Sequence, residues 1–286
     1  MRMRRFLAIG VLLGFALALP AHLGALPGEF EANRKKVEAA LAAAGHPVEK
    51  VLDVGLTIRN RGYDFPPLLL LMLRPTEDQK AVVRADPRTG TLIPVTVALM
   101  QDPEKNATLF SMVDWKSFEG YFDLDDDTRA KARASFQAIE KALAGLAPLQ
   151  YVPLPIEGAL RAPYVGGKVT ATGDLEEALL LTETGYQDRN MNVVGRTDFG
   201  GVHQLWLCSA EIARAFFGHM FPIASRAPCR AVVWEQDGAV YIVASDPAIE
   251  PGKVDPKAFP ADLMQAFMEV LKMNGGVLED LGVSAE

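Results

Sequence analysis

Cys208 and Cys229 are the only two thiols in a chain of 286 residues. Cys208 ends one apolar run, and Cys229 begins the next run after an intervening segment at 210–217. If these runs are neighbouring antiparallel strands, the end of one lies beside the start of the other, within the Cα separation that a disulfide allows. A bridge closing this loop would stabilise the fold by about 3 kcal/mol. A structural disulfide, a reversible thiol pair, and unpaired or metal-bound thiols all remain open on these residues alone.

Metal binding would need further ligands beside the thiols. His203 and His219 could supply two nitrogens to a tetrahedral zinc ion. However, His203 and Cys208 are five positions apart in a predicted strand, and alternation sends their side chains to opposite faces. The acidic stretch at 123–127 lacks the central glycine and terminal glutamate of a calcium loop, and is typical of a solvated helix N-terminus. The sequence therefore predicts no metal site and no cofactor.

Arg230 directly follows Cys229 and is the candidate ligand-binding residue. A guanidinium beside a sulfur could hold an anionic ligand or stabilise a thiolate, and the alternative is a solvated strand residue. The chain has no serine in a Gly-x-Ser-x-Gly turn and no phosphate-binding glycine loop of the Walker type. The catalytic residues, if any exist, remain unknown.

The pattern around these residues occurs twice along the chain. The segments LLLLMLRP at 68–75, LIPVTVAL at 92–99 and ATLFSMVD at 107–114 are echoed at 202–209, 226–233 and 239–246. Leu73 and Pro94 are 21 positions apart, as are Leu207 and Pro228. In this match Cys208 and Cys229 stand where the first copy has an arginine and a valine. We therefore expect a duplicated module of which only the second copy carries thiols.

Each copy is expected to contain a helix, two strands, a short helix, a strand hairpin and a closing helix. The pattern predicts an α+β fold with helices on one face of a mainly antiparallel sheet, and two such sheets packed as an internal pseudo-dimer. Asp237-Gly238 predicts a type I′ hairpin turn. The sequence also predicts a strand over 48–58 and a final helix over 258–273 that stops at Asn274-Gly275-Gly276. The modules are expected at 26–147 and 164–286, with a proline-rich linker at 148–163.

The first 25 residues have the form of a secretory signal peptide. Three arginines within Met1–Arg5 precede an apolar run at 6–19 that is shorter than the roughly 20 residues of a membrane span. Among the small residues Ala21, Gly24 and Ala25, cleavage is expected after Ala25. This predicts a periplasmic or secreted protein without a stable membrane span after cleavage, with an uncleaved N-terminal anchor as the alternative.

The chain is acidic overall, with a formal net charge of −7, and 49% of its residues are hydrophobic. A nucleic-acid partner would require a basic face, and an anionic membrane surface would repel this charge. The composition thus argues against both of these partners.

Three segments of the second half carry a family resemblance: NMNVVGR at 190–196, LWLCSAEIARAFF at 205–217 and APCRAVVWEQDGAVYIVASDP at 227–247. They resemble the bacterial family known as domain of unknown function 302. The resemblance implies a compact fold like that of the TATA-binding protein, commonly dimeric and without an assigned activity. Similar members have a cysteine after the apolar strand and a Pro-Cys-Arg triplet, which fall here on Cys208 and on Pro228, Cys229 and Arg230. The first half resembles the family more weakly.

These observations predict an exported, non-catalytic binding or accessory protein with a disulfide in its second domain. The alternative is a periplasmic thiol/disulfide redox or electron-handling protein that uses Cys208 and Cys229. The expected partner is a small molecule or a periplasmic protein. The expected assembly is a pseudo-dimeric monomer or a low-order oligomer.

Overall fold

Two antiparallel sheets form the core of the protein, and each contains a strand that is buried on both faces. In the first sheet this strand is the leucine run Leu68–Leu73, all of whose residues are buried. In the second it is Cys229–Gln236, whose middle residues are buried in succession. Strands buried on both faces read as continuous apolar runs, because both faces contact other layers. The computed structural model describes residues 21–102, 104–152, 162–247 and 260–283.

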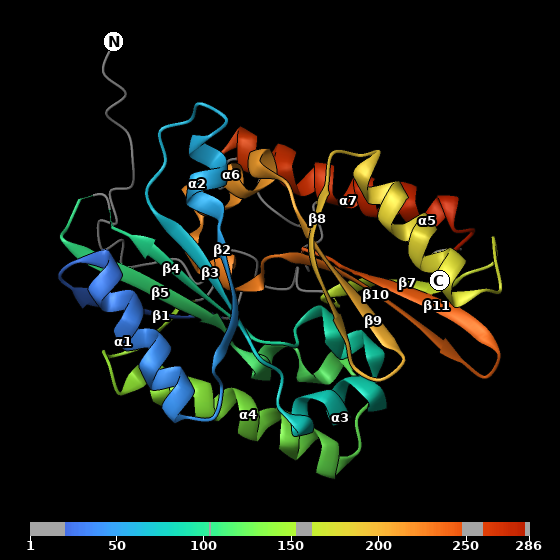
Figure 1. Ribbon diagram of the computed structural model, residues 1–286, viewed down its shortest axis with the longest axis horizontal. Coiled ribbons are helices and arrows are strands. Elements are labelled where there is room, and N and C mark those ends of the chain that lie inside the picture. The colour runs from blue at the N-terminus through green and yellow to red at the C-terminus, as the bar shows by residue number, and fades with distance from the viewer. Residues whose placement is uncertain (1–20, 103, 153–161, 248–259, 284–286) are drawn as a thin grey trace.

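The first module contains β1 (Ala21–Pro27), α1 (Phe30–Ala43), β2 (Val48–Asp53), α2 (Val54–Arg59), β3 (Leu68–Leu73), α3 (Glu77–Ala85), the 3-10 segment η1 (Pro87–Thr91), β4 (Thr96–Gln101), β5 (Ala107–Val113), η2 (Trp115–Ser117), η3 (Glu119–Tyr121), α4 (Asp126–Ala144) and β6 (Gln150–Val152). The second contains β7 (Tyr164–Lys168), α5 (Leu175–Gln187), β8 (Asn192–Asp198), β9 (Val202–Cys208), α6 (Ala210–His219), η4 (Phe221–Arg226), β10 (Cys229–Gln236), β11 (Ala239–Ser245) and α7 (Ala261–Asp280). Figure 1 shows the two sheets with their helices.

The strand order repeats between the sheets. The first sheet runs β2-β3-β4-β5-β1-β6. Written in the same direction, the second runs β8-β9-β10-β11-β7, which is the matching order without a counterpart of β6. The registers also agree: Leu71 pairs with Val97 in the first copy, and Leu205 pairs with Ala231 at the matched place in the second. Both outer strands, β2 and β8, carry an irregularity at the same point of the ladder. The predicted duplication and α+β fold are confirmed.

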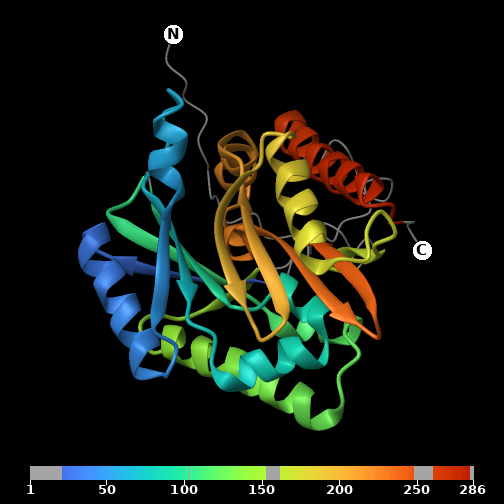
Figure 2. The ribbon, with the colours of Figure 1, turned by 45° about the vertical axis from the view of Figure 1, so that its right-hand side comes forward.

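Each sheet is covered on one side by helices of its own module and is contacted by elements of the other module as well. Helices α1 and α4 pack on the first sheet, and α5 packs with α7 on the second. Figure 2 shows α5 and α7 side by side on the outer side of the second sheet. From the other module, η4 contacts β4 and β5, while η1 contacts β10 and β11. Because matched elements exchange contacts reciprocally, the two modules form the expected internal pseudo-dimer.

Matched residues also touch at the pseudo-symmetry axis. Arg230 of β10 donates from Nη2 to Thr96 Oγ1 at 2.9 Å, and Thr96 is its counterpart on β4. Gln204 on β9 donates from Nε2 to the carbonyl of Ile93 at 2.7 Å, and also to that of Gly90. The interface between the modules is therefore a buried polar network rather than an apolar contact alone.

Turn chemistry accounts for several of the boundaries. Asp237 and Gly238 have φ of 52° and 72°, as the predicted type I′ turn between β10 and β11 requires. Helix α3 begins at a capping box in which Thr76 and Gln79 bond each other's backbone amides. Asp125 caps α4, where it accepts from the amide of Thr128 at 2.7 Å.

Two predicted elements differ from the structure. The strand expected over 48–58 ends at Asp53, whose carboxylate accepts from Leu56 N and caps the short helix α2. The final helix continues through Gly275 and Gly276 to Asp280, instead of ending at Met273. It continues because Val277 and Leu278 are buried beyond the glycines and hold the last turns against the module.

Two paired strands lie at the predicted module boundaries. The strand β1 begins at Ala21 and pairs over its whole length with β5, so residues 21–25, which fall within the predicted signal peptide, form part of the first sheet. Within the predicted linker, β6 pairs with the first three residues of β1. Residues 1–20 and 153–161 lie outside the described residues, so the signal peptide remains a prediction. None of the helices in the described ranges combines the length and apolar character needed to cross a membrane.

Candidate functional site: a cavity beside the cysteines

A cavity of about 80 Å³ lies in the second module, at the end of the sheet where β9 leads into α6. Its walls come from the end of β9, the inner face of α6, the segment η4, the start of β10, the residues after β11 and one turn of α7. Most of its side chains are apolar; those used below are Met191, Leu207, Cys208, Ile212, Ala213, Phe216, Ile223, Arg226, Cys229, Asp246, Pro247 and Val270. Both cysteines thus line a single cavity.

The two cysteines are free thiols, and the predicted disulfide is not formed. The strands β9 and β10 are antiparallel neighbours, as expected, but Cys229 pairs with Leu207 rather than with Cys208. This one-residue offset means that the two cysteines are not directly opposite each other across the strand pair. A disulfide needs Cβ atoms that approach each other, so the offset accounts for the difference.

Both thiols are held in the protonated form by their surroundings. Burial, together with the nearby Cys229 and Glu211, raises the pKa of Cys208 to about 12. Burial also raises the pKa of Cys229, although Arg226 and Arg230 act in the opposite direction. At neutral pH neither thiol is therefore an activated nucleophile.

Arg226 closes one side of the cavity. Its guanidinium donates to the carbonyls of Asp246 and Pro247 at 2.6 and 3.0 Å, and it lies over the ring of Phe118 from the first module. Burial lowers its pKa to about 10, while the charge of Asp246 opposes that shift. The guanidinium thus fastens the segment after β11 to η4 and forms part of the cavity wall.

Arg230 lies between the two modules. Its side chain is only 1% exposed, so it is not a solvated strand residue. It donates to the carbonyls of Thr91 and Pro94 at 3.1 and 2.7 Å, in the first module. It is not among the residues that line the cavity. Arg230 therefore joins the two modules, and its role as a ligand-binding residue stays a prediction.

The cavity lies where the first copy places larger side chains. Gln79 stands at the position that Ala213 has in the second copy, and its buried amide donates to Ser135 Oγ at 2.8 Å. Trp115 stands at the position of Pro247 and stacks on Phe136 with 5.0 Å between ring centroids. The second copy has smaller residues at both places, and a cavity remains between them.

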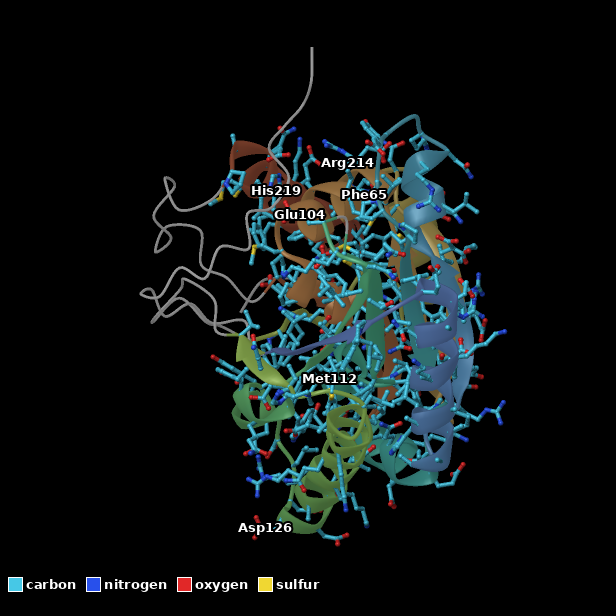
Figure 3. The ribbon with its side chains drawn as sticks, turned by 90° about the vertical axis from the view of Figure 1, so that its left-hand side faces the viewer. Phe65, Glu104, Met112, Asp126, Arg214 and His219 are labelled. Carbon is cyan, nitrogen blue, oxygen red and sulfur yellow. The ribbon has the colours of Figure 1, made fainter. Side chains whose placement is uncertain are left out.

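The helix that lines the cavity is held from behind by the first module. Between β2 and β3 the first copy has an insertion containing α2, which packs on α6. Arg214 of α6 lies 4.6 Å from the ring centroid of Tyr63, and Phe65 lies beside Gly218. Figure 3 shows Arg214 and Phe65 near each other at this junction, with Asp126 exposed at the opposite end of the molecule.

The other sequence candidates are not brought together. Within the described ranges, no three His, Cys, Asp or Glu side chains are grouped so that they could hold a metal ion. His219 instead contacts Asp262 at 3.0 Å. Asp125, Asp126 and Asp127 are exposed at the start of α4, as a solvated helix N-terminus requires.

Comparison with known proteins places the chain in a family. The model of the family described as "Domain of unknown function DUF302" matches residues 25–146 and 168–272. The chain belongs to the DUF302 family. The two matched segments correspond to the two modules, so the chain carries tandem DUF302 domains.

Two solved structures are similar to parts of the chain. A crystal structure of a DUF302 protein from Bacillus stearothermophilus is 16% identical, with a TM-score of 0.40, over 45% of this chain and 99% of that one. An alkyldihydroxyacetonephosphate synthase is 10% identical, with a TM-score of 0.17, over 96% of this chain and 42% of that one. Among curated proteins, no sequence matches the chain.

Arg226 and Ala213 were missed when the sequence was considered alone. The repeat contained a signal for both, because Arg226 aligns with Leu92 and Ala213 aligns with Gln79. A change from an apolar to a charged residue, and from a long to a short one, marks where the two DUF302 domains differ. Only the fold shows that both changes lie in the wall of one cavity.

Proposed function

We propose that the protein is an exported, non-catalytic binding module whose second DUF302 domain takes a small apolar ligand in the cavity beside Cys208 and Cys229. The observation that carries this proposal is the contrast between the two copies. The first copy has the larger residues Gln79 and Trp115 at the positions of Ala213 and Pro247, and these two smaller residues line the cavity of the second copy. Close packing is the rule in protein interiors, and a cavity retained in one of two matched copies is a candidate ligand site.

The residues that line the cavity determine which kind of ligand it can bind. Leu207, Ile212, Phe216, Ile223 and Val270 present apolar surface, which gains about 25 cal/mol for each Å² removed from water. The cavity of about 80 Å³ is smaller than the engineered apolar cavity of ~150 Å³ that accepts benzene. The cavity therefore takes the terminal few carbon atoms of a short aliphatic chain, and the rest of the chain extends out of it.

The thiol redox alternative has less physical support. Thiol–disulfide exchange needs a thiolate, and burial keeps both thiols protonated. The offset between the strands also leaves the two cysteines without direct cross-strand pairing. We therefore assign the thiols to the cavity wall, where a sulfhydryl behaves as a small hydrophobic group.

The proposal is tested with 1-hexanol as the probe. In methyl-labelled protein, we expect saturable NMR shifts at Met191, Ile212 and Ile223 in the native chain. Ala213→Met should abolish these shifts, because methionine has the length of the glutamine in the first copy without an amide that needs partners. Ala130→Met, the same change at an exposed position on α4, should leave them intact.

The possible results of these experiments distinguish the binding proposal from the redox alternative. A native chain without saturable shifts contradicts the proposal, and so does an Ala213→Met variant that binds 1-hexanol as the native chain does. If diamide oxidises the two thiols to an intramolecular disulfide in the folded protein, the redox alternative replaces the binding proposal.

A further inference from the structure

A second, more polar hollow of about 980 Å³ adjoins the cavity. We call it the groove, and it is lined by Arg61, Gln187, Arg189, Asn190, Asn192, Ser209, Glu211, Ile212, Glu269, Lys272, Met273, Gly275, Gly276 and Glu279. Ser209 and Ile212 belong to the walls of both the cavity and the groove. A ligand whose apolar end enters the cavity therefore has a polar surface next to it for its other end.

Packing accounts for one of the two glycines in the groove but not for the other. A Cβ on Gly276 would lie 2.6 Å from Nε of Arg189, so glycine leaves room there for the arginine side chain. A Cβ on Gly275 would meet nothing within 4 Å. Gly275 is exposed in the interior of α7, where glycine weakens a helix relative to alanine. The packing of the described residues thus gives no reason for Gly275, whereas close approach of a ligand to the helix backbone does.

The charges around the groove balance. Three basic residues, Arg61, Arg189 and Lys272, face three acidic ones, Glu211, Glu269 and Glu279. Two of the cations have acidic partners: Arg61 lies 3.7 Å from Glu211, and Arg189 lies 2.8 Å from Asp280. A balanced set of this kind does not favour an anionic or a cationic group. The amides of Gln187, Asn190 and Asn192 supply neutral donors and acceptors.

We propose that the ligand of the second domain is a net-neutral amphiphile, with a short aliphatic end in the cavity and an uncharged, hydrogen-bonding head in the groove over Gly275. This inference rests on the proposed function, because it requires the cavity to accept the aliphatic end. It adds the chemistry of the head group and a second set of contacts.

Three probes with the same six-carbon chain test the inference: n-hexyl-β-D-glucoside, hexanoate and 1-hexanol. We expect the glucoside to bind at least tenfold more tightly than 1-hexanol, and hexanoate to gain no such advantage. The amide signals of Asn190 and Gly275 should shift only with the glucoside. Gly275→Leu should remove the advantage of the glucoside while leaving 1-hexanol binding unchanged. Met268→Leu, an exposed change on the same helix outside the groove, should affect neither probe.

Failure of this inference differs from failure of the proposed function. If 1-hexanol binds but the glucoside binds no more tightly, the groove has no role and the cavity proposal stands. If hexanoate binds more tightly than the glucoside, the site selects an anion and the net-neutral head group is wrong. If none of the three probes binds, the proposed function itself fails.

Discussion

At the scale of single residues, Cys208 shows how burial controls chemistry in the cavity. Its thiol has an ordinary pKa of 9.0, and burial raises that pKa to about 12. Between these two pH values the unfolded chain releases a proton that the folded chain keeps. The stabilising contribution of the buried neutral thiol is therefore present below pH 9 and is lost as the pH rises toward 12.

This difference predicts the alkaline behaviour of a variant. Above pH 9, the free energy of unfolding of the native chain should fall relative to that of Cys208→Ala by up to about 1.4 kcal/mol per pH unit. Urea unfolding at pH 8, 9 and 10 measures the slope. Asp126→Asn, an exposed change at the start of α4, should keep the native slope because it leaves both thiols in place. Parallel profiles for the native chain and Cys208→Ala would show that the thiol is not buried.

At the scale of elements, the pairing of β1 leads to a prediction about where a processed chain would begin. All seven residues of β1 pair with β5, and Ala21 to Leu23 also pair with β6 on the other side. Cleavage after Ala25 would remove most of a strand with neighbours on both sides, leaving the backbone groups of β5 and β6 without partners. Such loss of buried hydrogen bonds is costly.

If the chain is processed for export as proposed, we therefore expect the processed protein to begin at His22 or earlier, as measured by intact-mass analysis of material from its native host. A purified chain comprising residues 22–286 should also unfold at a higher urea concentration than one comprising residues 26–286. A mature N-terminus at Leu26, or equal stability of the two chains, would contradict this role for β1.

Elements were predicted correctly from the sequence where the local residue pattern favours the same structure as the tertiary fold. The repeated spacing of Leu73 to Pro94 and Leu207 to Pro228 located matched strands, and Asp237-Gly238 located a hairpin. Prediction failed at Gly275, where apolar contacts beyond the glycines carry the helix onward, and at Asp53, whose side chain caps a helix within an apparent strand. The disulfide failed by one position of register, which no spacing in the sequence could reveal. The cavity depends on side chains from several separate elements, and a single sequence does not show that they meet.

At the scale of the whole molecule, the two copies carry different residues at the pseudo-symmetry axis that relates them. Arg230 and its counterpart Thr96 touch each other, and the arginine inserts among carbonyls of the first module. Two second copies paired in the same way would place two buried guanidinium groups against each other, which is strongly unfavourable. The interface therefore favours pairing of the first copy with the second, and the two modules should unfold together.

Replacing Arg230 tests this coupling. Arg230→Met removes the donors to Thr91, Pro94 and Thr96, and should lower the free energy of unfolding by about 3 kcal/mol or more. Arg196→Met, which removes an exposed arginine and its surface ion pair from β8, should cost less than about 1 kcal/mol. Urea unfolding followed by both tryptophan fluorescence and circular dichroism gives the comparison. Separate transitions for the two modules in the native chain would contradict a single cooperative unit.

The central claim is that the second domain retains a ligand cavity that the first domain has filled. Xenon binds in dry apolar cavities, so a crystal of the protein pressurised with xenon tests this claim most directly. We predict an anomalous peak enclosed by Leu207, Ile212 and Cys229, with none at the matched place between Gln79 and Trp115. Absence of a peak beside Cys229, or peaks of equal height in both domains, would contradict the account.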